Sequence, residues 1–241
     1  MIPDIYRVQE LAANALHVQE RIETACVQCG RRKEDVRLIW VSKTHPIEDI
    51  EAAVCAGATD FGENKLQESL EKFSIPRPGI TVHLIGPVQS NKWRKAVGVA
   101  DWIHSAGSLD ELLKYNMLSA ELGKKLNVLI QVNTSGEPSK SGLCMDNADD
   151  FLRSLPDFSH LHLRGLMTIG KNTGVAEDSR EGFAWLRGLR DHIRKPDGAF
   201  AAFTELSMGM TDDLEIAIAE GSTMVRVGSA IFGKRMYPNR S

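Results

Sequence analysis

Short apolar runs alternate with amphipathic stretches along almost the whole chain. The runs are rich in β-branched and aromatic residues, and most are followed by apolar residues at helical spacing. From the runs we predict strands at Val36–Val41, Asp60–Phe61, Val82–Ile85, Trp102–His104, Val128–Val132, Leu163–Thr168, Glu205–Ser207 and Met224–Val227. Between them we predict helices at Ile47–Ala56, Lys65–Phe73, Ser90–Val97, Leu109–Leu122, Asn147–Leu155, Asp178–Ile193 and Asp212–Glu220.

This alternation predicts an α/β fold, a single (β/α)8 TIM barrel that occupies residues 1–241. Eight strand–helix units fit that length. The residues before the first strand mix charged and apolar positions and predict an extra amphipathic helix over the bottom or side of the barrel, not a signal peptide. An open doubly wound sheet is the alternative, but it would usually carry a G-x-G-x-x-G motif after its first strand, and this sequence has none there.

Composition narrows the function classes. The net charge is −3, and charged residues make up 25% of the chain, so there is no general attraction to nucleic acid or to an anionic membrane. The basic stretch Ser90–Lys95, with one tryptophan, is the alternative nucleic-acid contact, but it is typical of a solvated helix face. No apolar run is long enough to span a bilayer, and we expect a cytoplasmic protein.

The cysteines offer no metal site. Cys26 and Cys29 form one isolated C-x-x-C, whereas a zinc site would need further ligands at suitable spacing. With Cys55 and Cys144, they are expected to be ordinary thiols.

The chemistry is expected where the strands end, because barrel active sites lie at the carboxyl ends of the strands. Lys43 lies two residues after the first predicted strand. A lysine held in a partly apolar pocket has a lowered pKa, and its neutral amine can attack an aldehyde. A lysine that simply reaches solvent is the alternative.

The last two strand ends predict a phosphate site. Ser207 ends the seventh strand, Gly209 and Thr211 follow it just before a predicted helix, and Gly228 and Ser229 follow the eighth strand. Hydroxyls, a flexible glycine and helix-start N–H groups suit an anion, and barrels commonly bind phosphate here. Alternatively, Thr211 is only a helix N-cap and Gly228 only a turn residue.

Arg226 lies within the eighth strand and shares a face with Gly228. If that face is the interior, the buried cation needs a partner, which is either a ring acceptor of a ligand or a carboxylate such as Glu205. A lysine, a phosphate site and an arginine facing a heterocycle together suit pyridoxal 5′-phosphate (PLP), held as a Schiff base by Lys43. An arginine beside the ring nitrogen weakens the ring as an electron sink.

Several motifs then show a resemblance to a known family. "VSKTHP", "FGENKLQE", "HLIGPVQSNK", "VNTSGEPSKSGL" and "LSMGMTDDLEIAIAEGSTMVRVGSAIFG" resemble the YggS/PROSC-type pyridoxal phosphate homeostasis protein family. The resemblance implies an alanine racemase-like barrel without the racemase's second β-domain, and a PLP carrier without established turnover. It implies that the cofactor-binding residues are Lys43, Asn64, Ser207, Thr211, Arg226, Gly228 and Ser229.

Other functions stay open at this point. A PLP-dependent racemase or lyase needs a second acid/base group, for which His83, His104 and Tyr237 are the candidates. An aldolase could use Lys43 on a sugar phosphate without PLP. For the carrier, we expect PLP-dependent apo-enzymes as partners, no catalytic residue, no bound metal and a monomer.

Overall fold

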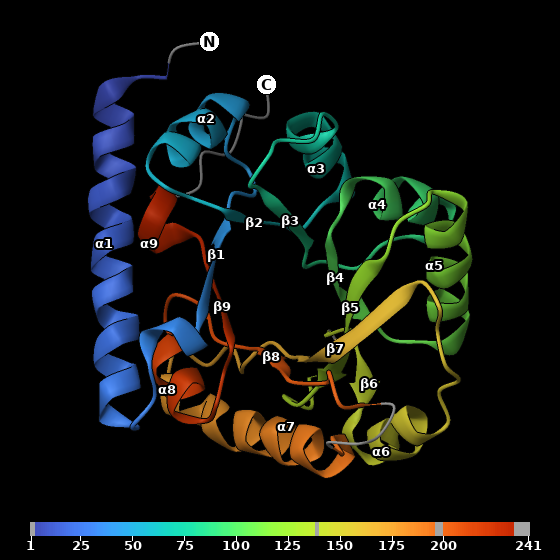
Figure 1. Cartoon of the computed structure of the whole chain (residues 1–241). Coiled ribbons are helices and arrows are strands. Elements are labelled where there is room, and N and C mark those ends of the chain that lie inside the picture. The colour runs from blue at the N-terminus through green and yellow to red at the C-terminus, as the bar shows by residue number, and fades with distance from the viewer. Residues whose placement is uncertain (1–2, 138–139, 196–199, 234–241) are drawn as a thin grey trace.

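The computed structural model describes residues 3–137, 140–195 and 200–233. Parallel strands close into a barrel in the order β4-β3-β2-β1-β9-β8-β7-β5, and β5 pairs back with β4 (Figure 1). This confirms the predicted (β/α)8 barrel. The barrel strands are β1 (Arg37–Val41), β2 (Asp60–Glu63), β3 (Thr81–Leu84), β4 (Trp102–Ala106), β5 (Leu126–Asn133), β7 (Leu161–Met167), β8 (Glu205–Ser207) and β9 (Met224–Val227). The short strand β6 (Leu143–Cys144) pairs with the end of β5.

The helices surround the barrel close to the predicted positions. Short 3-10 turns at Ser90–Lys92 and Ala176–Ser179 replace the predicted first turns of two helices, and α8 begins two residues later than predicted. The four-residue helix α9 was not predicted, because so short a segment carries no periodicity. The helices are α1 (Ile5–Gln28), α2 (Ile47–Cys55), α3 (Leu66–Phe73), α4 (Trp93–Val99), α5 (Leu109–Glu121), α6 (Met145–Arg153), α7 (Arg180–Ile193), α8 (Leu214–Ala219) and α9 (Ser229–Phe232).

The N-terminal helix α1 lies along the side of the barrel, beside α2, α8 and α9 (Figure 1). Its start is capped by Asp4, whose carboxylate accepts the Tyr6 N–H at 3.0 Å. Leu11, Val18 and Ile22 recur at helical spacing and are buried against the barrel wall. Of the two predicted positions, the side is therefore the correct one.

The barrel interior combines an apolar cluster with polar side chains. Along β9, Met224 points inward, while Val225 and Val227 pack outward in the same cluster as α1. Since side chains alternate along a strand, Arg226 also points inward, which is one of the two orientations that the sequence left open. The inner apolar cluster consists of Ile39, Trp102, Leu129, Met167 and Met224.

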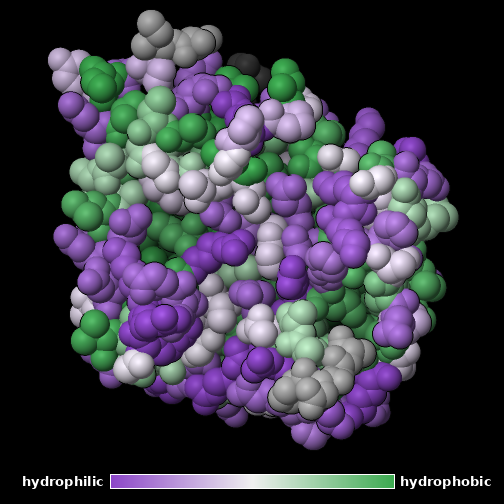
Figure 2. Space-filling model, viewed as in Figure 1, coloured by the Kyte–Doolittle hydropathy of each residue, from purple (hydrophilic) through white to green (hydrophobic). Residues whose placement is uncertain are grey.

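The surface in Figure 2 is mostly hydrophilic, with apolar residues interspersed among the polar ones. Trp93, in the basic stretch Ser90–Lys95, packs edge-on against Tyr115, and its indole N–H donates to the carbonyl of Val88. The tryptophan therefore anchors α4 to α5. Across the described residues, none of the helices has the length and apolar character needed to cross a membrane.

Candidate functional site

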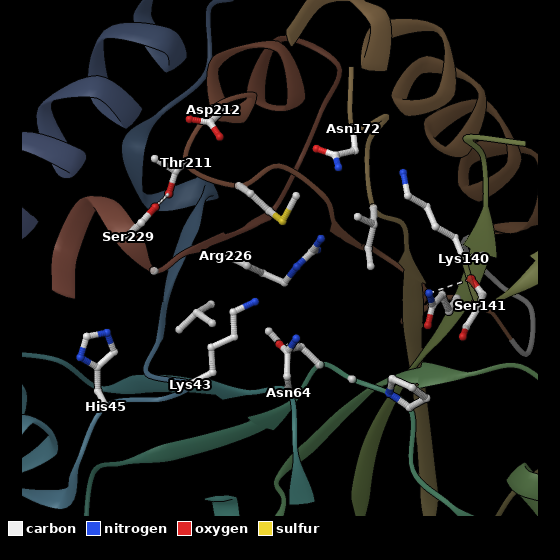
Figure 3. Close-up of a pocket in the computed structure, with 18 of the residues that line it drawn as sticks. Lys43, His45, Asn64, Lys140, Ser141, Asn172, Thr211, Asp212, Arg226 and Ser229 are labelled. Carbon is white, nitrogen blue, oxygen red and sulfur yellow. Dashed lines mark hydrogen bonds between the residues drawn. The ribbon is translucent and has the colours of Figure 1, made fainter. Parts of the chain in front are cut away.

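Lys43 lies two residues beyond the end of β1, in a tight turn. The N–H of His45 donates to the carbonyl of Ser42 at 3.1 Å and closes this turn. Thr44, its third residue, has a φ of 68°, in the left-handed region that a β-branched residue rarely adopts. The turn places Lys43 in the wall of a pocket, where its side chain extends towards Arg226 (Figure 3).

The strained turn is held from the neighbouring β2–α3 unit. The carboxylate of Glu68 accepts the Thr44 N–H at 2.6 Å. The buried ammonium of Lys72 donates to the Ser42 carbonyl at 2.8 Å and to the Glu63 carboxylate at 2.7 Å. A left-handed non-glycine residue costs about 1–3 kcal/mol, so it persists only where surrounding contacts fix it. These contacts determine where Lys43 points.

Two hydroxyls face each other on another wall of the pocket. Thr211 Oγ1 lies 3.3 Å from Ser229 Oγ (Figure 3). Thr211 does not cap α8, because Asp213 occupies the cap position and its carboxylate accepts the Met210 N–H at 2.6 Å. The hydroxyl of Thr211 is therefore not used by the helix, which argues against the alternative that Thr211 is only a helix N-cap.

Glycines allow the loops after β8 and β9 to approach their neighbours. Gly209 has a φ of 92°, and a Cβ there would lie 2.5 Å from the Cβ of Ala217. A Cβ on Gly228 would lie 3.0 Å from the Val41 carbonyl oxygen at the end of β1. A larger residue at Gly209 would push its loop away from α8, and one at Gly228 would push the loop after β9 away from the end of β1, next to the Lys43 turn.

Arg226 is the buried cation of the site. Its guanidinium donates to Ser207 Oγ at 2.7 Å and to the Thr168 carbonyl at 2.9 Å. Burial lowers the pKa of Arg226 to about 10, so it stays charged at neutral pH. Glu205, the carboxylate considered as a partner, instead accepts from the Thr223 hydroxyl at 2.7 Å. The guanidinium also lines the pocket.

A chain of hydrogen bonds continues from Ser207 across the barrel interior. Ser207 Oγ lies 3.0 Å from His104 Nδ1, and His104 Nε2 lies 3.0 Å from His83 Nδ1. His83 Nε2 lies 3.1 Å from a carboxylate oxygen of Asp60. Burial lowers the pKa of His83, and that of His104 well below the ordinary value, so both imidazoles are neutral at pH 7.

The carboxylate fixes the direction of this chain. Burial alone would raise the pKa of Asp60, but the hydrogen bond from His83, the hydrogen bond from Thr59 and the charge of Arg37 lower it, so the group is ionised and only accepts. His83 Nε2 must therefore donate to it, and His83 Nδ1 accepts from His104 Nε2. His104 Nδ1 in turn accepts a hydrogen bond from the Ser207 hydroxyl. The Ser207 oxygen is then left to accept a hydrogen bond from Arg226.

The structure places Ser207 away from the predicted phosphate position. Its hydroxyl is buried between Arg226 and His104, and Ser207 does not line the pocket. At the end of β8 it faces the barrel interior, so it supports the arginine rather than the anion loop. The other predicted residues are brought together around one pocket: Lys43, Asn64, Thr211, Arg226, Gly228 and Ser229.

The pocket has a volume of about 510 Å³. The predicted residues come from β2, β1, β9 and β8 and the loops after them, which are consecutive neighbours in the barrel although β1 and β9 are far apart in the sequence. The predicted site did not include six further polar residues on these walls. One lies in β5, and the others lie on turns and loops. They are Gln131, His45, Lys140, Ser141, Asn172 and Asp212.

Comparison with known proteins identifies the family. The model of the alanine racemase N-terminal domain family matches residues 9–236. The pyridoxal phosphate homeostasis protein of Escherichia coli K12 is 39% identical, with 97% of this chain and 100% of that protein covered. The protein of that name from Pasteurella multocida is 40% identical, with 93% and 97% covered. The chain belongs to the pyridoxal phosphate homeostasis protein family.

Solved structures of other proteins are also similar to this chain. The structure of PipY of Synechococcus elongatus with PLP bound is 33% identical, with a TM-score of 0.79 and with 92% of this chain and 100% of that chain covered. An alanine racemase of Clostridium difficile has a TM-score of 0.72 but 14% identity, with 96% of this chain and 58% of that chain covered. The racemase likeness therefore shows a shared fold only.

The two buried imidazoles predict a pH-dependent stability. Unfolded histidines take up a proton near pH 6.5, whereas His83 and His104 resist protonation in the fold. The unfolded state binds more protons in this range, so the free energy of unfolding falls as pH drops below about 6.5, by up to about 1.4 kcal/mol per pH unit for each histidine. Urea unfolding of wild type and His104→Asn between pH 5 and 7.5 measures this slope.

The slope is expected to be shallower in His104→Asn and unchanged in His17→Asn, since the His17 side chain is 73% exposed. Equal slopes in wild type and His104→Asn would contradict the neutral, buried state of the two histidines.

Proposed function

We propose that this protein binds PLP reversibly and acts in PLP homeostasis rather than as an enzyme. One observation carries the proposal: a single pocket joins Lys43, the Thr211–Ser229 hydroxyl pair and the buried Arg226. The names of the relatives and the PLP in the PipY structure support the same ligand.

The residues around the pocket fit this cofactor. When bound, PLP supplies an aldehyde that condenses with a primary amine, and Lys43 would provide that amine. The Thr211 and Ser229 hydroxyls would donate to phosphate oxygens, beside the backbone of Gly228. Arg226 has five N–H groups, and its bonds to Ser207 and Thr168 leave others to donate to an unprotonated ring nitrogen.

Asn64 would lie beside the ring. It follows β2 and lines the pocket next to Lys43 (Figure 3). A Cβ on Gly86 would lie 2.2 Å from the Asn64 carbonyl oxygen, so the β3 loop packs directly on its backbone. This contact restricts where the Asn64 backbone can lie.

We predict that, after unbound PLP is removed, wild type keeps a visible absorption band and Lys43→Ala keeps none, because the covalent link to the ε-amine retains the cofactor on the protein. Borohydride reduction and peptide mapping should find the label on Lys43. Lys65→Ala is the matched control, since the Lys65 side chain is 75% exposed, and it should keep the band.

A label on Lys140, Lys65 or Lys92 would contradict the assignment to Lys43. Trapping with a sugar phosphate but not with PLP would favour the aldolase alternative. Lys234, a further candidate amine, lies outside the described residues.

The proposal that turnover is absent rests on where the candidate acid/base groups lie among the described residues. His83 and His104 lie in the barrel interior rather than on the pocket wall, and Tyr237 is outside the described residues. His45 and Lys140 line the pocket, but both are engaged. His45 lies 3.0 Å from the Asp49 carboxylate, and Lys140 donates to Glu137 at 2.7 Å and to the Gly170 carbonyl at 2.6 Å.

We predict that the PLP-loaded protein does not speed the exchange of amino-acid α-protons with solvent deuterium beyond the rate with PLP alone, because a racemase or lyase needs a second proton-transferring group. Proton NMR of L-alanine and other common amino acids in D₂O follows this exchange. Exchange well above the rate with PLP alone, lost in Lys43→Ala, would establish the racemase or lyase alternative.

The wider role is also a proposal. A reversible carrier would pass PLP to PLP-dependent apo-enzymes, and the net charge of −3 gives no general affinity for nucleic acid. We further propose that the protein acts as a monomer in the cytoplasm and consists of one barrel domain. The full-length match to the E. coli relative supports the domain proposal.

A further inference from the structure

One stripe of α1 carries polar residues that face the loops after β8 and β9, which carry Thr211 and Ser229. Arg7, Asn14 and Arg21 recur at intervals of seven residues. Seven residues are almost two full helical turns, so these side chains lie along one line of the helix. In Figure 1, α1 runs beside α8 and α9, the helices that follow the loops with Thr211 and Ser229.

Each residue of this stripe donates to a backbone carbonyl. Arg21 Nη2 donates to the Thr211 carbonyl at 2.8 Å. Asn14 Nδ2 donates to the Ile231 carbonyl at 2.9 Å. Arg7 Nη2 donates to the Phe232 carbonyl at 3.0 Å. The stripe therefore contacts both hydroxyl-bearing segments from the side away from the pocket.

These carbonyls need such partners. The α9 helix has four residues, from Ser229 to Phe232, too few to be stable without outside contacts. The last carbonyls of a helix have no partner within it, and here Asn14 and Arg7 supply donors to two of them. The position of Ser229, the first residue of α9, thus depends on α1.

The two arginines act through position rather than net charge. Both oxygens of the Glu215 carboxylate accept from Arg21, at 2.7 and 2.9 Å. The carboxylate of Asp49 accepts from Arg7 in the same two-bond manner, at 2.9 and 2.7 Å. Each paired carboxylate balances the cation and orients its guanidinium towards the loop carbonyl.

We propose that the Arg7–Asn14–Arg21 stripe holds the Thr211 and Ser229 hydroxyls at the spacing that a phosphate group needs. The helix α1 thereby sets the preference of the pocket for the phosphorylated ligand over the unphosphorylated aldehyde. This inference rests on the proposed function, because it takes the pocket to be the PLP site.

The test compares the dissociation constants of PLP and pyridoxal, which lacks the phosphate, by absorbance titration. Arg21→Met removes the donors to Thr211 and should weaken PLP binding ~tenfold while pyridoxal binding changes less than about twofold. Arg31→Met is the matched control, because Arg31 donates to the Ile218 carbonyl at the far end of α8, and it should leave both constants within about twofold.

Two more variants keep the test decisive if Arg21→Met folds poorly. Asn14→Ala should lower the PLP-to-pyridoxal preference ~threefold through loss of one neutral hydrogen bond. Glu215→Gln removes the charge that balances Arg21. If the charge of Arg21 attracted the phosphate, this variant would bind PLP more tightly, whereas the positional role predicts no gain.

An unchanged PLP-to-pyridoxal preference in both Arg21→Met and Asn14→Ala would overturn the inference, as would tighter PLP binding by Glu215→Gln. Failure of the proposed function would look different, since wild type itself would then give no saturable absorbance change with PLP.

Discussion

The site depends on one buried cation, the guanidinium of Arg226. A charged group inside a barrel is stable only when hydrogen bonds replace its water. Ser207 and the Thr168 carbonyl provide these bonds, and the ionised Asp60 orients Ser207 through two neutral histidines. The barrel closes with β9 between β1 and β8, so the same cation faces the Lys43 turn and the hydroxyl-bearing loops.

The groups that would contact a ligand lie on turns and loops, but elements outside the pocket hold them. The β2–α3 unit fixes the strained turn at Thr44 through Glu68 and Lys72. The helix α1 fixes the loops after β8 and β9 through side chains that reach backbone carbonyls. A carrier that binds and releases one cofactor is well served by such an arrangement, because binding need not order the loops.

The sequence alone could predict the barrel and most of the pocket. Strand ends converge in this fold, so Lys43, Thr211 and Ser229 could be brought together without coordinates. Ser207 could not be placed, because a residue at the end of β8 can face either the pocket or the interior, and its decisive partner His104 is 103 positions away. The seven-residue spacing on α1 is visible in the sequence, but the carbonyls that give it meaning lie about 190 or more positions further along.

Asp60 sets the direction of the hydrogen-bond chain that ends on Arg226. Nitrogen-15 NMR of the imidazole groups at pH 7, assigned with His83→Asn and His104→Asn, shows which ring nitrogen of each histidine carries the proton. We expect both histidines to be neutral, with the proton on Nε2. A proton on Nδ1 of either ring, or a charged imidazolium, would contradict it.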